Sequence, residues 1–232
     1  MKLRIKITKD DSIRFISHLE YIRTIERAIR RAKLPAAYSE GFNPHLKFSL
    51  ASALGVGVAS KAEFVEVELA EAVELKSALQ ALQASLPRGI GVLEADLVTK
   101  KTGKLMALTR GASYLIKVPC LACDWQSALD EYNNAASIIF AKALPKEKYK
   151  TKDIEVKHFV PKITGSYEEG IIELSFDCAI TPTGSMKAIE VLQVLQKQLG
   201  LPLVLEKADI LRTDLYTTDE QGKKQPLLNN HD

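Results

Sequence analysis

Residues 14–48 read RFISHLEYIRTIERAIRRAKLPAAYSEGFNPHLKF, and this stretch decides the first part of the fold. Ser17 followed by Glu20 is a capping-box pattern, which predicts a helix over residues 18–33. Apolar residues and arginines both recur there at helical spacing. At ~100° per residue the two sets point roughly 165° apart, so one face is expected in a core and the other in solvent. The apolar set is Leu19, Ile22, Ile25, Ile29 and Ala32, and the basic set is Arg23, Arg27, Arg30 and Arg31.

The helix is expected to end at Pro35, and a polar loop from Tyr38 to His45 follows. Gly41 permits positive φ and Pro44 restricts the exit, so the pattern predicts a rigid loop. Phe42 is expected to fill the gap between helix and sheet. Tyr38 is then the aromatic side chain expected in solvent.

The composition is that of a soluble globular protein of one or two domains. Of 232 residues, 46% are hydrophobic and 26% charged. No apolar run approaches the ~20 residues of a membrane span. The N-terminus lacks the apolar core of a signal peptide. These features predict a cytoplasmic protein with no membrane partner.

Positive charge is concentrated at the N-terminal end of the chain. The net charge is +3, but the first 50 residues carry 11 Lys and Arg against five Asp and Glu. A one-sided basic surface attracts phosphate-rich or acidic partners. A solvated helix face without function remains open, because Arg is also a good helix former.

The order of predicted elements is β-α-β-β-α-β, and it occurs twice. The fold class is therefore predicted as α+β, with two tandem ferredoxin-like domains and antiparallel sheets. The domains are expected at 1–100 and 112–216, followed by a disordered tail at 217–232. In the second domain the predicted strands are 113–118, 154–160, 171–178 and 203–213, and the predicted helices are 124–139 and 186–199.

Cys120 and Cys123 form a CxxC pair. A tetrahedral zinc site needs about four ligands, and the sequence holds no second CxxC. Cys178 and His158 would complete a site only if the fold brought them there. We therefore predict no metal site and no cofactor, and the pair's role stays open between incidental thiols and a ligand pair.

Several motifs resemble the uncharacterised bacterial family of radical-SAM-linked proteins. The resemblance rests on RFISHL from Arg14, ERAIRRA from Glu26 and YSEGFNPH from Tyr38, and it continues through LGVG, Ser60 and Ala62–Glu63 to Arg212–Thr213. It implies a radical SAM protein as partner. The chain itself has no CxxxCxxC motif for an iron–sulfur cluster. Leu46 and Gly55 stand where the family pattern favours proline.

Two histidines beside the basic segment, His18 and His45, are the candidates for catalysis, because imidazole transfers protons near neutral pH. Each also has a structural interpretation, as helix-start packing for His18 and a strand-entry hydrogen bond for His45. The residues expected to bind nucleic acid are Arg14, Arg23, Arg27, Arg30, Arg31, Tyr38, Asn43 and His45.

Three functions follow from these patterns. The first is a non-catalytic RNA-binding or RNA-positioning accessory protein that works with a radical SAM enzyme. The second is a metal-independent endoribonuclease that uses His18 or His45. The third is a protein-interaction module whose basic face docks an acidic patch of a radical SAM partner, since guanidinium pairs with carboxylate as well as with phosphate.

Overall fold

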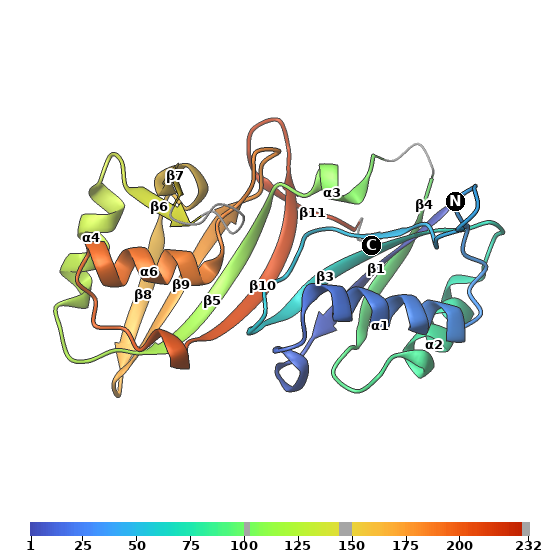
Figure 1. Ribbon diagram of the computed structural model, residues 1–232, viewed down its shortest axis with the longest axis horizontal. Coiled ribbons are helices and arrows are strands. Elements are labelled where there is room, and N and C mark those ends of the chain that lie inside the picture. The colour runs from blue at the N-terminus through green and yellow to red at the C-terminus, as the bar shows by residue number, and fades with distance from the viewer. Residues whose placement is uncertain (100–102, 144–149, 229–232) are drawn as a thin grey trace. The chain divides into compact units, whose positions relative to one another are not determined.

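The computed structural model describes residues 1–99, 103–143 and 150–228, and the chain separates into two compact units. One unit consists of residues 1–110 together with the chain from Arg212 onward, and the other spans Gly111–Leu211. Both mix helices with antiparallel strands (Figure 1), so the predicted α+β class is confirmed. The expected boundary at residue 100 and part of the expected linker lie outside the described residues.

The first unit is built on an antiparallel sheet in the order β4-β1-β3, with β2 pairing the other edge of β3. Two helices, α1 and α2, cover one face of this sheet (Figure 1). The element bounds are β1 Lys2–Lys9, η1 Asp11–Ile13, α1 His18–Arg31, β2 Phe48–Leu50, β3 Val58–Glu68, α2 Leu75–Ser85, β4 Val92–Val98 and α3 Leu105–Leu108.

The predicted capping box of α1 is confirmed. The backbone N–H of Glu20 donates to Ser17 Oγ (3.2 Å), and the N–H of Ser17 donates to a Glu20 carboxylate oxygen (2.8 Å). Two otherwise unpaired N–H groups are thereby satisfied. This fixes where α1 begins and hence which of its faces meets the sheet.

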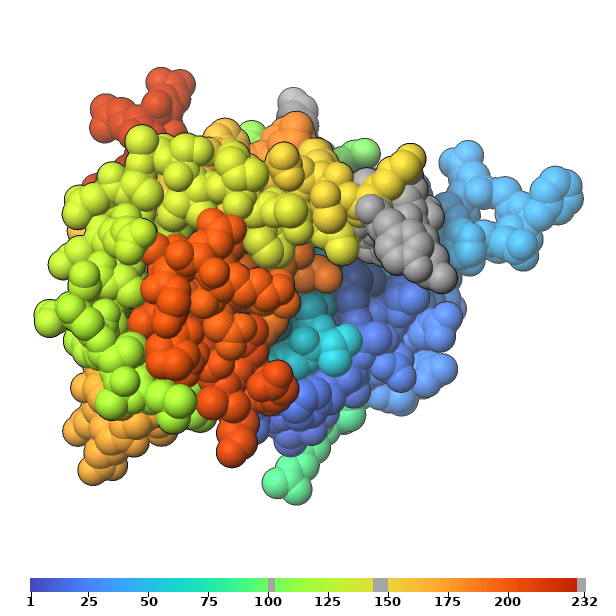
Figure 2. All heavy atoms as spheres, turned by 60° about the vertical axis from the view of Figure 1, so that its left-hand side comes forward, coloured from blue at the N-terminus to red at the C-terminus, as the bar shows by residue number. Residues whose placement is uncertain are grey.

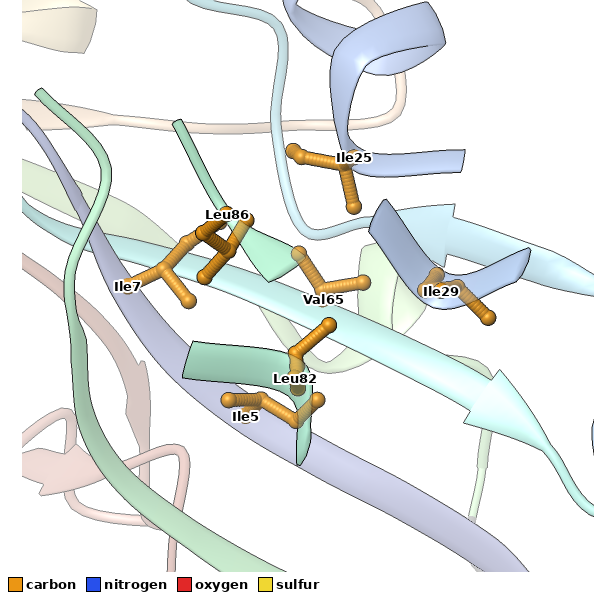
Figure 3. Close-up of a pocket in the computed structure, with 7 residues that line it drawn as sticks. All are labelled: Ile5, Ile7, Ile25, Ile29, Val65, Leu82 and Leu86. Carbon is orange, nitrogen blue, oxygen red and sulfur yellow. The ribbon is translucent and has the colours of Figure 1, made fainter. Parts of the chain in front are cut away.

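The core of the first unit lies between α1, α2 and the sheet. Ile25 and Ile29 are buried there as predicted, but Leu19 is 63% exposed and Tyr21 takes its place in the core. Tyr21 can be buried because its hydroxyl donates to the carbonyl of Thr8 (2.9 Å). The pocket in this core is entirely aliphatic, with no polar group to orient a ligand (Figure 3); its lining is Ile5, Ile7, Ile25, Ile29, Val65, Leu82 and Leu86.

The second unit has a sheet in the order β5-β9-β8 and a separate hairpin, β6-β7. Helices α4 and α6 lie against the sheet (Figure 1). The bounds are β5 Gly111–Pro119, α4 Trp125–Asn134, β6 Ile139–Ala143, β7 Thr151–Glu155, α5 Val156–Phe159, β8 Ile163–Glu168, β9 Ile171–Ala179, α6 Ala188–Gln198 and η2 Leu205–Lys207.

The strand expected over 154–160 is wrong. β7 ends at Glu155, whose carboxylate accepts the N–H of Lys157 (3.1 Å) and caps the one-turn helix α5. The actual hairpin partner of β9 is β8, Ile163–Glu168, which lies between the expected strands 154–160 and 171–178. The helix expected over 124–139 is also shorter, and 139–143 is a strand. A segment as short as 154–160 has no period that separates strand from helix, which explains the first error.

The end of the chain differs from the expected disordered tail. β10 runs through Asp209–Thr218 and pairs with β11, Lys224–Pro226. Leu227 and Leu228 are buried, and the Leu227 carbonyl accepts a hydrogen bond from the Arg4 guanidinium (2.9 Å). Residues 229–232 of the expected tail lie outside the described residues. Within the described ranges, no helix has the length and apolarity to cross a membrane.

We expect Ser17→Ala to lower the free energy of unfolding by about 0.5–2 kcal/mol, because the N-cap acceptor of α1 is lost. Urea titration followed by circular dichroism measures this. Thr24→Ala is the matched control on the same helix. Its hydroxyl only back-bonds to the Glu20 carbonyl (2.8 Å), and alanine favours helix, so stability should be unchanged or slightly higher. Equal losses in both variants would contradict the capping role.

Candidate nucleic-acid interface and a buried charge cluster

The outer face of α1 presents the four predicted arginines to solvent. Arg23, Arg27, Arg30 and Arg31 are all exposed, while Tyr21, Ala28 and the two core isoleucines lie on the buried side. The helix start fixed by Ser17 sets this orientation. We call these four side chains the arginine row.

Arg30 links the arginine row to the loop that follows the helix. Its guanidinium donates to the Tyr38 hydroxyl (3.0 Å) and lies 5.2 Å from the centre of the Tyr38 ring. It also pairs with Glu26 (2.8 Å), one helical turn earlier. An acid one turn away therefore balances part of the positive charge at Arg30. Because the pair is exposed, its net stabilisation is small and the cation remains accessible.

Arg31 makes a different contact, since it donates to the Ser85 carbonyl at the end of α2 (2.6 Å). An arginine beside a helix C-terminus is favoured by the helix dipole. Part of its role is thus to hold α1 against α2, while the side chain stays exposed.

The loop from Ser39 to His45 is closed at its base. The N–H of Ser39 donates to the His45 carbonyl (2.8 Å), and the N–H of His45 donates to Ser39 Oγ (2.9 Å). Tyr38 and Leu46 pair next to this closure. The loop, shown in light blue, projects from the surface in Figure 2. We call it the projecting loop.

Phe42 lies at the tip of the projecting loop and is fully exposed. The expectation that it fills the gap between helix and sheet is wrong. That gap is already filled by Tyr21 and the aliphatic residues of the core. Asn43 and His45 are exposed as well. The loop thus presents one aromatic and two polar side chains to solvent, and it follows directly after Tyr38, which contacts Arg30 of the arginine row.

A second group of polar residues is buried in the first unit near the start of α1. Lys9, Arg14, Glu63 and Arg212 are each at most 8% exposed, and they come from β1, the segment after η1, β3 and β10. His18 is half-buried beside them. We call these five residues the buried charge cluster.

Glu63 and Arg212 are the centre of the buried charge cluster. The Arg212 guanidinium donates to Glu63 Oε1 (3.0 Å) and to the Ala53 carbonyl (2.9 Å). A register shift between β1 and β3 adjoins Glu63: Ile7 pairs with Glu63, but Lys9 pairs with Ser60. One extra residue therefore lies in β3. Such a bulge redirects the neighbouring side chains.

The other two cations of the cluster hold the segment around residues 14–16. Lys9 donates to the carbonyls of Arg14 (2.9 Å) and Ile16 (3.1 Å). The Arg14 guanidinium donates to the Gly57 carbonyl (2.8 Å) and pairs with Asp11 (2.6 Å). Arg14 is thus occupied inside the protein, which separates it from the exposed residues with which it was grouped.

Among the described residues, two buried atoms of this cluster have no hydrogen-bond partner: Glu63 Oε2 and His18 Nδ1. Burial lowers the pKa of His18; the Glu63 charge opposes this effect, and Arg212 and Lys9 add to it. Burial also lowers the pKa of Lys9, again against the opposing Glu63 charge. The cluster therefore favours neutral imidazole at His18.

The two candidate histidines lie near opposite ends of α1. His18 is its first residue, whereas His45 belongs to the projecting loop, which follows Tyr38, the residue that Arg30 contacts near the end of α1. A 14-residue helix is about 21 Å long. They therefore do not form a joint acid–base pair, and only His45 adjoins the arginine row near its C-terminal end.

The CxxC pair lies in the second unit. Cys120 is buried and Cys123 exposed, with 3.8 Å between their sulfur atoms. Burial, followed by the hydrogen bond with Cys123, raises the pKa of Cys120 to about 12. No cluster of three metal-ligating side chains occurs among the residues that the structure describes.

Residues 2–195 match the family described as "Uncharacterized protein conserved in bacteria (DUF2344)". The chain belongs to this family. No curated protein matches the DUF2344 chain.

The DUF2344 chain is also similar to chains of known structure. One, in the crystal structure of a Cbf5-Nop10-Gar1 complex, is 13% identical, with a TM-score of 0.55 over 94% of this chain and 50% of that chain. Another, in an archaeal box H/ACA sRNP Nop10-Cbf5 complex, is 11% identical, with a TM-score of 0.47 over 90% of this chain and 46% of that one. The chain spans about half the length of both. At 13% identity, the similarity to the chain in the Cbf5-Nop10-Gar1 complex shows a similar fold and nothing more.

The sequence does not identify the buried charge cluster as a unit. Its patterns predict other roles for Arg14 and His18 and no role for Lys9. Glu63 and Arg212 entered only through the family resemblance. A signal was present at Glu63, which stands in a largely apolar run, Ala62–Val65. An acid within a buried strand requires a cation, but the sequence does not say that the cation is residue 212.

We expect Arg212→Met to destabilise the protein by about 3–5 kcal/mol, because Glu63 then remains as a buried charge without its main partner. Lys61→Met removes an exposed charge two residues away on β3 and should change little. Adding Glu63→Gln to Arg212→Met should restore part of the loss. Chemical denaturation measures all three. A double variant less stable than Arg212→Met would contradict a destabilising unpaired carboxylate.

Stability should fall as the pH drops from about 7 to 5. A folded-state pKa of His18 below its ordinary value of about 6.5 means that the unfolded chain binds more protons in this window, so acid favours unfolding. The midpoint of thermal unfolding at several pH values measures this. His18→Gln should flatten the dependence. A wild-type slope retained in His18→Gln would refute the assignment.

Proposed function

We propose that this chain is a non-catalytic RNA-binding protein that contacts the phosphate backbone through the arginine row. The observation that carries the proposal is the exposure of four guanidinium groups on one face of a capped helix. One of them, Arg30, contacts Tyr38, the residue directly before the projecting loop. Arginine binds phosphate oxygens in bidentate geometry, and rows of such side chains supply most of the affinity of RNA-binding surfaces.

The projecting loop favours RNA over an acidic protein patch as the partner. An acidic patch would pair its carboxylates with the arginine row. Such pairing does not explain the exposed aromatic ring of Phe42 or the exposed polar side chains of Asn43 and His45. Unpaired bases offer both a flat apolar surface and polar edges. The protein-interaction module therefore explains fewer of the exposed residues.

The endoribonuclease that uses His18 or His45 is not favoured. His18 is half-buried in the buried charge cluster, and His45 lies near the opposite end of α1 without the other candidate histidine beside it. Arg14 is left out of the proposed interface, since its guanidinium is bonded to Gly57 and Asp11. The proposed RNA-binding residues are therefore Arg23, Arg27, Arg30, Arg31, Tyr38, Asn43 and His45.

The finer setting of this function is also a proposal. The sequence resemblance supports an accessory role beside a radical SAM enzyme in the cytoplasm, in which this chain positions the RNA and the partner performs the chemistry. The strand order β4-β1-β3-β2 of the first unit supports a ferredoxin-like plan there. For the second unit, the same plan requires the hairpin β6-β7 to be an insertion.

We expect the combined change of Arg23, Arg27, Arg30 and Arg31 to Gln to abolish most RNA binding. For single strands each phosphate contact contributes about 0.7 to the slope of log affinity against log salt, so the slope should fall by up to about 3. Fluorescence anisotropy with a labelled single-stranded RNA at several salt concentrations measures both effects.

The control carries the same charge change elsewhere. Lys152, Lys162, Lys197 and Lys207 are exposed residues of the second unit, and their combined change to Gln should leave affinity and slope close to wild type. Equal losses in the two variants would indicate an effect of net charge alone. A wild-type protein without salt-sensitive RNA binding would refute the proposed function.

A further inference from the structure

Phe42 is a large apolar side chain that the fold leaves entirely in water. Single exposed apolar residues are common on proteins, but they usually retain contact with their neighbours. Here the residue stands in the middle of the projecting loop, which extends from the surface (Figure 2). The ring therefore contributes no hydrophobic stabilisation to the fold. A bound partner that covers the ring would gain this stabilisation instead.

The projecting loop is braced, so the position of Phe42 is restricted before any partner binds. The two hydrogen bonds between Ser39 and His45 close the base of the loop. Gly41 adopts φ +115°, which an L side chain rarely adopts, and Pro44 limits the backbone on the other side of the tip. A restricted loop loses little conformational entropy on binding, which favours affinity.

Tyr38 provides a second aromatic ring near the arginine row. It is 43% exposed, and its edge is held by the hydroxyl contact with Arg30. Phe42 lies four positions further along the chain, and an extended chain covers at most about 14 Å over that length. The two aromatic residues therefore lie within about 14 Å of each other along the backbone, and Tyr38 contacts the Arg30 guanidinium.

We infer that Phe42 is a base-stacking residue, so that the RNA bound at this surface is single-stranded or looped at the point of contact. This inference rests on the proposed RNA-binding function and names its substrate class. An unpaired base can stack on the exposed ring while its phosphates meet the arginine row. A base inside a duplex is already stacked on its neighbours and cannot reach the ring.

A lipid surface is the other partner that combines negative charge with an apolar contact. The tip fits it poorly, because Phe42 is a single apolar residue flanked by Glu40 and Asn43, both exposed and polar. Insertion of the ring would carry the Glu40 carboxylate toward the hydrocarbon, which is unfavourable. Glu40 and Asn43 can instead pair with the polar edge of a base.

The test compares three variants at Phe42 with two RNA probes, a single strand and a duplex of equal length. Phe42→Ala should weaken binding of the single strand roughly 5- to 150-fold, the range for loss of one aromatic–base stack. Phe42→Leu should lose nearly as much, since it keeps apolar character but not the flat ring. Phe42→Trp should bind as tightly as wild type. Because Phe42 contacts no phosphate, the salt slope should not change.

Stacking also has a direct optical readout. In Phe42→Trp with Trp125→Phe, the new side chain is the only tryptophan of the chain, since the sequence has one. Its fluorescence should be quenched by the single strand and not by the duplex. Every change except the one at Trp125 is at Phe42, which is fully exposed, so the variants should fold. Circular dichroism checks this.

The outcomes separate this inference from the proposed function. If the arginine variant loses binding while Phe42→Ala binds the single strand normally, the stacking role is overturned and the RNA-binding function stands. Equal losses on single strand and duplex would also overturn it. If the wild-type protein binds neither RNA, the proposed function fails. Binding to vesicles of phosphatidylserine that depends on Phe42, without binding to RNA, would assign the tip to a lipid surface.

Discussion

The ion pair between Glu63 and Arg212 is the interaction on which the first unit depends. It joins two residues that are 149 positions apart, both almost completely buried. A carboxylate without a cation in that position would be strongly destabilising, so the fold requires the chain from Arg212 onward to return to residues 1–110. The same constraint helps to explain why the end of β10, β11 and the buried Leu227 are ordered in the segment from residue 217 onward, where the polar sequence favoured disorder.

The buried charge cluster also determines where α1 begins. Lys9 holds the carbonyls of Arg14 and Ile16, directly before the Ser17 cap. A helix has a fixed angular relation between its first residue and every later one. The cluster at the start of α1 therefore contributes to the direction in which the arginine row points. Structural and proposed binding residues thus occupy one helix but have separate tasks.

The sequence predicted the elements with clear periodicity and failed where periodicity was short or absent. α1 begins at the predicted cap, and Ile25 and Ile29 are buried as expected. In a 14-residue helix the apolar spacing repeats over several turns, so the pattern is clear. The segment 154–160 gave no such evidence and was assigned to a strand. Leu19 fits the apolar stripe by angle alone, yet it lies in the first helical turn beyond the edge of the core, so spacing could not show its exposure.

The sequence by itself determined the α+β class, the cap of α1 and the two-faced character of that helix, because each follows from residues within a few turns of one another. Only the tertiary structure decided the rest. It paired Glu63 with Arg212, used Arg14 internally and left Phe42 in solvent once Tyr21 had filled the core. Those outcomes depend on which distant side chains occupy each buried site in the folded protein. Local spacing in the sequence does not show which side chains share buried space or pair their charges there.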